Sequence, residues 1–123
     1  MHALIVDDSP TMRLILREHL KNLGFHVTEA VDGCDALVRL RQMQKADVVL
    51  VDCNMPVMDG LAFIRAVRAE QAYATLPLMM VTTNSEASDV SRALEAGANE
   101  YLKKPFTGAM IREKLASMGL PAA

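Results

Sequence analysis

The sequence predicts a single α/β domain with a doubly wound, five-stranded parallel sheet and five helices. Short apolar runs such as Val48–Val51 and Leu78–Val81 have no polar alternation, which is typical of strands covered on both faces. Segments with helical spacing of apolar residues separate these runs, and the loops between them are short. With 123 residues and 51% hydrophobic content, residues 1–123 can bury a core as one domain.

The first half of the chain shows clear signals for helix ends. Ser9 is a favourable N-cap, Pro10 fits the first helical turn, and Gly24 is expected to end the helix. Cys34 is expected to pack within a second helix. The predicted elements are a strand at Leu4–Val6, a helix between Ser9 and Gly24, a strand at Phe25–Ala30, a turn at Asp32–Gly33 and a helix at Cys34–Met43.

The second half continues the alternation of strands and helices. Asp59, either Asn84 or Ser85, and Thr107 are the expected N-caps of its helices. Gly97 is expected to end the fourth helix. The predicted elements are a strand at Asp47–Asp52, a helix over about Gly60–Glu70, a strand at Leu78–Val81, a helix through Glu95, a strand at Asn99–Lys103 and a helix to about Met118.

The strand at Asp47–Asp52 ends in a carboxylate. Pro56 follows shortly after and has no amide hydrogen to continue a strand. Asp52 is therefore predicted at the carboxyl end of a central buried strand, where open α/β sheets place their chemistry. A carboxylate buried there costs free energy unless another group pairs with it.

Other polar residues are expected to reach the same edge of the sheet. If the strand order is 2-1-3-4-5, the strand order reverses between the first and third strands, and Asp7 and Asp8 lie beside Asp52. Thr82 and Lys104 close the fourth and fifth strands at that edge. Crowded carboxylates require either a shared proton or a cation, and oxygen ligands with room for water favour Mg²⁺. Such a pocket suits phosphoryl transfer, with Asp52 as the nucleophile.

Each of these residues also has a plain structural interpretation. An Asp pair after a strand often caps the next helix, and Asp59 is expected to be only a cap. Thr82 could be an ordinary hydroxyl at a strand end, and Lys104 a solvated turn residue. The combination at the carboxyl ends of several strands favours the functional interpretation.

Composition and charge disfavour other classes of function. The net charge is −2, and no basic stretch is longer than Lys103–Lys104, which disfavours direct nucleic-acid binding. No apolar run approaches the roughly 18 residues of a membrane span. The N-terminus has no room for a signal peptide, so a cytoplasmic location is expected. The two cysteines, Cys34 and Cys53, have neither metal-site spacing nor disulfide density.

Several motifs together resemble the receiver domain of two-component response regulators, and in particular stand-alone chemotaxis-type regulators. The motifs are Asp7–Asp8, the loop Asp52-Cys-Asn-Met-Pro-Val-Met-Asp-Gly60, Val81–Thr82 and Tyr101-Leu-Lys-Lys-Pro-Phe106. The resemblance covers essentially the whole chain. It implies a flavodoxin-like fold with strand order 2-1-3-4-5.

The resemblance implies roles for the residues at the site. Asp52 would accept a phosphoryl group from the phosphohistidine of a sensor histidine kinase. Asp8 would bind Mg²⁺ directly and Asp7 mostly through water, and Asp52 and the backbone carbonyl of Asn54 would complete the protein ligands. The protein would catalyse only its own phosphorylation and dephosphorylation and would not otherwise be an enzyme.

The resemblance also implies a switch and an output face. Lys104 would pair with the phosphoryl oxygens and Thr82 would move to bond one of them. Tyr101 would rotate on the face formed by the fourth helix, fifth strand and fifth helix, which would contact a protein partner. Asn54 and Asn84 would tune the rate at which water removes the phosphoryl group. The bond preceding Pro105 is expected to be cis, and the chain to be a monomer or a weak phosphorylation-dependent dimer.

Three alternatives stay open at this point. The chain could be a receiver excised from a longer regulator, such as a nucleotide cyclase or a transcription factor. It could be a flavin-binding protein of the same fold, although the acidic loop at Asp7–Asp8 would repel a phosphate that lacks a metal. It could also be a Mg²⁺-dependent phosphatase, although the chain is short for a cap over a substrate.

Overall fold

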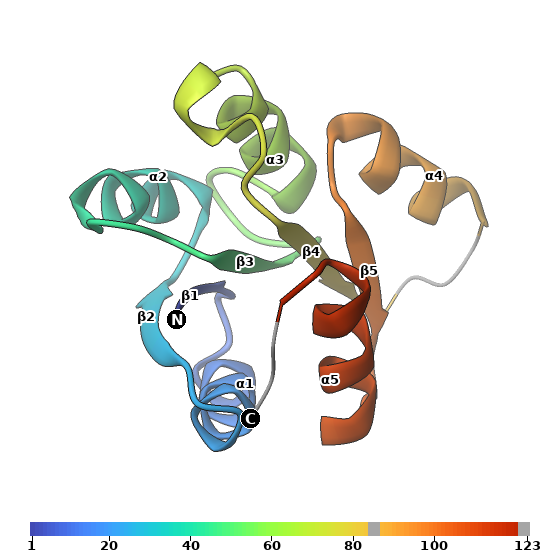
Figure 1. The fold of residues 1–123 in the computed structure, drawn as a ribbon. Helices are drawn as coiled ribbons and strands as arrows, with labels where there is room; N and C mark the ends of the chain where they lie inside the picture. Colours follow the sequence, from blue (N-terminus) through green and yellow to red (C-terminus); the bar gives the residue numbers. More distant parts are fainter. Residues whose placement is uncertain (84–86, 121–123) are drawn as a thin grey trace.

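The computed structural model describes residues 1–83 and 87–120, which form one parallel sheet with helices on both faces (Figure 1). The strand order β2-β1-β3-β4-β5 confirms the predicted topology. The elements are β1 (His2–Val6), α1 (Pro10–Asn22), β2 (His26–Ala30), α2 (Gly33–Gln42), β3 (Val48–Asp52), α3 (Gly60–Arg68), the 3-10 turn η1 (Gln71–Tyr73), β4 (Leu78–Thr82), α4 (Ala87–Ala96), β5 (Glu100–Lys103) and α5 (Gly108–Ser117).

The core consists of two layers, one on each face of the sheet. Strands β3 and β4 are buried at every position, as their continuous apolar runs predict. Alternate residues of β3 point to opposite faces, so that Val49 and Val51 pack with α2, α3 and α4, whereas Val48 and Leu50 pack with α1 and α5. Figure 1 shows the same division of the helices.

The predicted N-caps are present where the structure describes them. The side chains of Ser9, Asp59 and Thr107 accept hydrogen bonds from backbone amides in the first turns of α1, α3 and α5. Gly24 has a positive φ of 91° just beyond α1, as expected for a helix end. The proposed caps of α4, Asn84 and Ser85, lie outside the described residues.

Three local predictions were wrong. Asp32 is not a turn residue but the N-cap of α2, since its side chain accepts from the Asp35 amide at 2.8 Å. The helix consequently begins at Gly33. Cys34 is exposed and does not pack, because Gly33 and its neighbours one turn onward occupy the buried side of α2. Helix α3 ends at Arg68, and a 3-10 turn that the sequence did not indicate follows it.

The start of β3 also differs slightly from the prediction. The strand begins at Val48, while Asp47 bonds to the backbone of His2 through its own amide (2.8 Å) and its carboxylate (2.8 Å). Asp47 thus holds the amino ends of β1 and β3 together without belonging to the strand. Within residues 1–83 and 87–120, no helix has both the length and the apolar character needed to span a membrane.

Candidate functional site

Strands β1 and β3 bring three carboxylates together at the carboxyl edge of the sheet. Val6 pairs with Val51 in register, which sets Asp7 beside Asp52 at the ends of the two strands. Asp7, Asp8 and Asp52 each offer an oxygen, and these oxygens lie within 4.8 Å of one another. Asp7 is 1% exposed and Asp52 8% exposed, whereas Asp8 is open to solvent. The predicted cluster therefore exists.

Lys104 supplies positive charge between two of these carboxylates. Its Nζ lies 3.4 Å from Asp7 Oδ2 and 3.4 Å from Asp52 Oδ1, and its side chain is 16% exposed. Its backbone amide donates to the Thr82 carbonyl at 2.8 Å, which places the residue directly after the pairing of β4 with β5. The Lys104–Pro105 bond is cis, as expected. The interpretation of Lys104 as a solvated turn residue is excluded.

The charge of Lys104 does not balance the cluster. Burial raises the pKa of Asp52, the negative charges of Asp7 and Asp8 raise it further, and Lys104 offsets these effects only in part. The site thus carries excess negative charge among oxygen donors, with Asp8 open to solvent. Carboxylate oxygens with space for water suit a hard dication such as Mg²⁺.

Backbone contacts hold Asp7 in place without neutralising it. The Ser9 amide donates to Asp7 Oδ1 at 2.9 Å, and Arg13 Nη1 donates to the Asp7 carbonyl oxygen at 2.8 Å. The Arg13 guanidinium pairs with Glu29 at 3.2 Å and not with the carboxylate of Asp7. Arg13 therefore orients the backbone of Asp7, and the cation that contacts the Asp7 carboxylate is Lys104, at 3.4 Å.

Gly60 allows the start of α3 to approach Asp52 closely. A Cβ on Gly60 would collide with the backbone carbonyl oxygen of Asp52 and lie 3.0 Å from the Cα of Cys53. The Gly60 amide donates to the Cys53 carbonyl at 3.0 Å. The sequence prediction used Gly60 as the start of a helix and as the last residue of the Asp52–Gly60 motif, and it missed this role.

The loop between β3 and α3 contains a strained residue near the site. Val57 has a positive φ of 69°, which is unfavourable for a β-branched side chain, and the residue is 82% exposed. The amide of Met58 donates to the carbonyl of Pro56 at 2.7 Å, and the chain turns tightly around Val57. This loop leads from Asp52 to α3, and sequence reasoning did not identify its conformation.

The other predicted residues lie at different distances from the cluster. Thr82 is buried at the end of β4. The pKa of the Cys53 thiol is raised chiefly by burial. Asn54 is exposed in the loop after β3. Tyr101 is half-buried on β5 and separate from the carboxylates. Asn84 lies outside the described residues.

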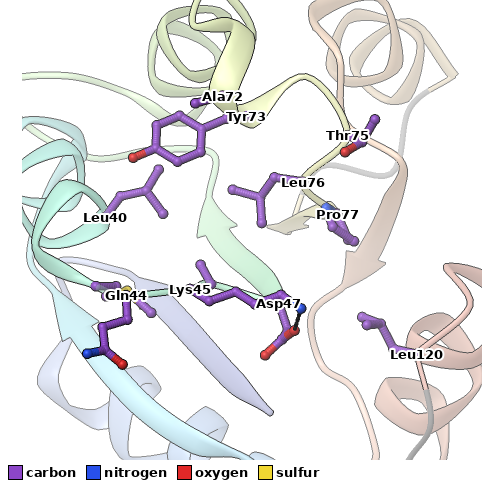
Figure 2. A pocket seen from close by; sticks show the side chains of 12 residues that line it. Leu40, Gln44, Lys45, Asp47, Ala72, Tyr73, Thr75, Leu76, Pro77 and Leu120 are labelled. Atoms are coloured by element: carbon purple, nitrogen blue, oxygen red, sulfur yellow. Dashed lines mark ion pairs between the residues drawn. The ribbon is translucent and has the colours of Figure 1, made fainter.

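A separate cavity of about 540 Å³ opens at the amino edge of the sheet, opposite the cluster. Figure 2 shows Tyr73, Leu76 and Pro77 around it, with Lys45 and Asp47 below. The carboxylate of Asp47 pairs with Lys45 at 3.6 Å. Asp47 is the one carboxylate among the residues that line this cavity, whereas three carboxylates converge at Asp52.

Comparison with known proteins agrees with this geometry. Residues 3–116 match the family model of the response regulator receiver domain. This chain belongs to the response regulator receiver family. The receiver is 44% identical to the chemotaxis protein CheY homolog of Campylobacter jejuni over 116 residues, which is 94% of this chain and 89% of that protein.

Solved structures of receivers have the same fold. The chemotaxis protein CheY4 of Vibrio cholerae superposes with a TM-score of 0.89 at 33% identity, over 95% of this chain and 97% of that one. The receiver domain of a sensor histidine kinase from Pseudomonas aeruginosa gives a TM-score of 0.84 at 34% identity, over 96% of this chain and 97% of that one. That domain was solved with a magnesium ion coordinated in its active-site cleft.

Membership in this family defines the general function of the chain. It is a CheY-like receiver of two-component signalling that phosphorylation activates, and it is a signalling protein and not an enzyme of metabolism. Its acidic pocket of Asp7, Asp8 and Asp52 has the ligand set to hold a metal ion.

Proposed function

We propose that Asp52 is the phosphoacceptor of this receiver and that a sensor histidine kinase is the donor. A carboxylate oxygen of Asp52 attacks the phosphorus of a phosphohistidine, so that an O–P bond forms and the N–P bond breaks. The histidine nitrogen keeps the electron pair of that bond and takes up a proton. The observation that carries this proposal is the position of Asp52 at the end of the central strand, 3.4 Å from Lys104 and beside Asp7.

Mg²⁺ is the proposed metal of the site. Asp8, Asp7, Asp52 and the backbone carbonyl of Asn54 would hold it, and the bound ion would neutralise negative charge around the transferred group. The excess charge that raises the pKa of Asp52 supports a dication there. The magnesium ion in the Pseudomonas aeruginosa receiver is consistent with this choice.

Lys104 and Thr82 are proposed to bind the phosphoryl group after transfer. The ammonium of Lys104 pairs with one phosphoryl oxygen, and the hydroxyl of Thr82 moves to bond another. Both groups lie at the same sheet edge as Asp52, which supports these roles. Asn54 and Asn84 are proposed to set how fast water removes the group.

The output of the switch is proposed to be a change in the face formed by α4, β5 and α5. Tyr101 lies on this face and would report the movement of Thr82. New contacts made only in the phosphorylated state would shift the population towards a form that binds a protein partner.

The 44% identity to a chemotaxis protein supports chemotaxis as the pathway and the cytoplasm as the location. Residues 1–123 would act as one domain, as a monomer or a weak dimer.

The test is intact mass after incubation with Mg²⁺ and acetyl phosphate. Wild type is expected to gain one phosphoryl group only when Mg²⁺ is present, and Asp52→Asn is expected to gain none. Asp32→Asn is a matched control, since Asn can also cap α2. An equal gain in Asp52→Asn would show that Asp52 is not the acceptor, whereas no gain in folded wild type would show that the site does not react with a small phosphodonor.

A further inference from the structure

A compact group of polar side chains surrounds Tyr101 on the proposed output face. Lys114 Nζ lies 4.6 Å from the centroid of the Tyr101 ring and 3.2 Å from Glu100 Oε1. The same oxygen of Glu100 accepts from the Tyr101 amide at 3.1 Å, and its other oxygen accepts from Ser117 Oγ at 2.9 Å. Glu100 thus links Lys114 to β5, the strand that contains Tyr101.

This contact passes around the edge of the sheet. Tyr101 pairs in register with Met80 and packs on the face covered by α2, α3 and α4. Lys114 belongs to α5, which packs on the opposite face through Ile111 and Leu115. Because β5 is an edge strand, the side chain of Lys114 reaches around it to the ring. The ring is therefore held between the core and an ammonium from the other layer.

The ion pair is better shielded than a typical surface pair. The side chains of Lys114 and Glu100 are 28% and 21% exposed. Burial tends to raise the pKa of Glu100, but hydrogen bonds from the Tyr101 amide, Ser117 and Lys114 outweigh it, and the pKa is lowered. Glu100 is accordingly charged at neutral pH, and the attraction to Lys114 persists. An ammonium over an aromatic face is itself an attractive contact.

Strand β5 connects this group directly to the phosphorylation site. Tyr101 and Lys104 are separated by two residues, and Lys103 pairs in register with Thr82 at the end of β4. The Lys104 amide is bonded to the Thr82 carbonyl at 2.8 Å. A displacement of Lys104 or Thr82 towards a phosphoryl group thus acts on the strand that bears Glu100 and Tyr101.

We propose that Glu100 and Lys114 form a latch that holds the Tyr101 ring in its present position and opposes activation of the output face. The latch rests on the proposed function, because it regulates the switch described there. Glu100 and Lys114 are positioning residues: neither touches the carboxylate cluster. Breaking the latch should leave phosphorylation chemistry intact and make the active form easier to reach.

The experiment follows Tyr101 while the phosphoryl mimic beryllofluoride is titrated in the presence of Mg²⁺. The chain has two tyrosines, so Tyr73→Phe leaves Tyr101 as the single tyrosine, and 3-fluorotyrosine then gives one ¹⁹F resonance for the ring. The measured quantity is the beryllofluoride concentration at which half of that resonance has converted. Stability is measured on every variant by urea unfolding.

Lys114→Met and Glu100→Gln are expected to lower the half-conversion concentration by roughly threefold to tenfold, the range for one partly exposed charged contact. The double variant should do little more than either single variant, because both changes break one latch. Lys114→Arg should restore a near wild-type value, since a guanidinium can pair with Glu100 and lie over the ring. A purely structural role would not give this pattern of coupling and rescue.

The matched controls remove the same charges elsewhere on α5. Arg112→Met and Glu113→Gln change exposed residues that do not contact Tyr101 in the described structure, and they should leave the half-conversion concentration unchanged. Equal values for Lys114→Met and Arg112→Met would overturn the latch alone. A wild-type resonance that never responds to beryllofluoride would instead overturn the proposed function, and the latch with it.

Discussion

At the residue scale, the position that suits Asp52 for chemistry is unfavourable for its charged form. Its carboxylate is nearly buried beside Asp7, and Lys104 is the cation within 3.4 Å of both. Burial and repulsion raise the pKa of Asp52, which means that its ionised form is less favourable in the folded protein than in the unfolded chain. The site therefore stores unfavourable electrostatic energy that a metal ion can relieve.

Asp52→Asn should stabilise the metal-free protein. The amide keeps the shape of the side chain and removes the repulsion with Asp7, so the free energy of unfolding in EDTA should rise by roughly 0.5–2 kcal/mol. Urea unfolding with and without the substitution measures this. A lower stability of Asp52→Asn in EDTA would mean that Lys104 already neutralises the pair.

Gly60→Ala should destabilise the protein because the new methyl group collides with the backbone of Asp52. The expected loss in free energy of unfolding is about 1–3 kcal/mol. Gly108→Ala is the matched control, since Gly108 is also the first residue of its helix and its Cβ would meet only the movable side chain of His19, at 3.1 Å. Similar losses in both variants would show that the backbone contact is not the cause.

At the scale of elements, Arg68 joins α3, η1 and the turn before β5. Its guanidinium donates to the carbonyl oxygens of Gly97 (3.0 Å) and Tyr73 (2.7 Å) and to the side-chain oxygen of Asn99 (2.8 Å). These acceptors are neutral, and burial lowers the pKa of Arg68. The side chain of Asn99 also accepts from the Leu78 amide at 2.9 Å, which extends the network to β4.

Arg68→Met should lower the free energy of unfolding by about 1–3 kcal/mol, because the methionine keeps the apolar stem but leaves these acceptors without their donor. Thermal and urea unfolding measure the loss. Arg65→Met, an exposed change on the same helix, should stay within about 0.5 kcal/mol. If the two variants were equally stable, the network around Arg68 would contribute nothing that water cannot replace.

At the scale of the whole molecule, binding of Mg²⁺ should be coupled to folding. The three carboxylates come from positions 7, 8 and 52 and converge only in the folded chain. The midpoint of thermal unfolding should consequently rise with Mg²⁺ concentration, with a stabilisation of about 1.4 kcal/mol when the free ion is tenfold above its dissociation constant. Asp8→Asn should weaken this response, while Asp35→Asn, which changes a carboxylate outside the cluster, should retain it. A response that is the same in both variants would exclude the cluster as the metal site.

The sequence by itself determined the fold class, the strand order and the meeting of Asp7, Asp52 and Lys104 at one edge. These followed because apolar periodicity encodes which residues are buried, and parallel strands bring their carboxyl ends to the same side. Local patterns predicted the structure less reliably where one residue type suits two kinds of local structure. Asp32, for example, could form a turn or cap a helix, and it caps α2.

Only the tertiary structure decided the charge balance at Asp52, the close approach of Gly60 and the contacts of Lys114 and Arg68. Lys114 contacts the Tyr101 ring around the edge of the sheet. Arg68 of α3 donates a hydrogen bond to the carbonyl oxygen of Gly97, which follows α4. Such contacts depend on how each helix is rotated and how closely it approaches the sheet. That geometry is set by the packing of the whole core and leaves no mark in the pattern of any single segment.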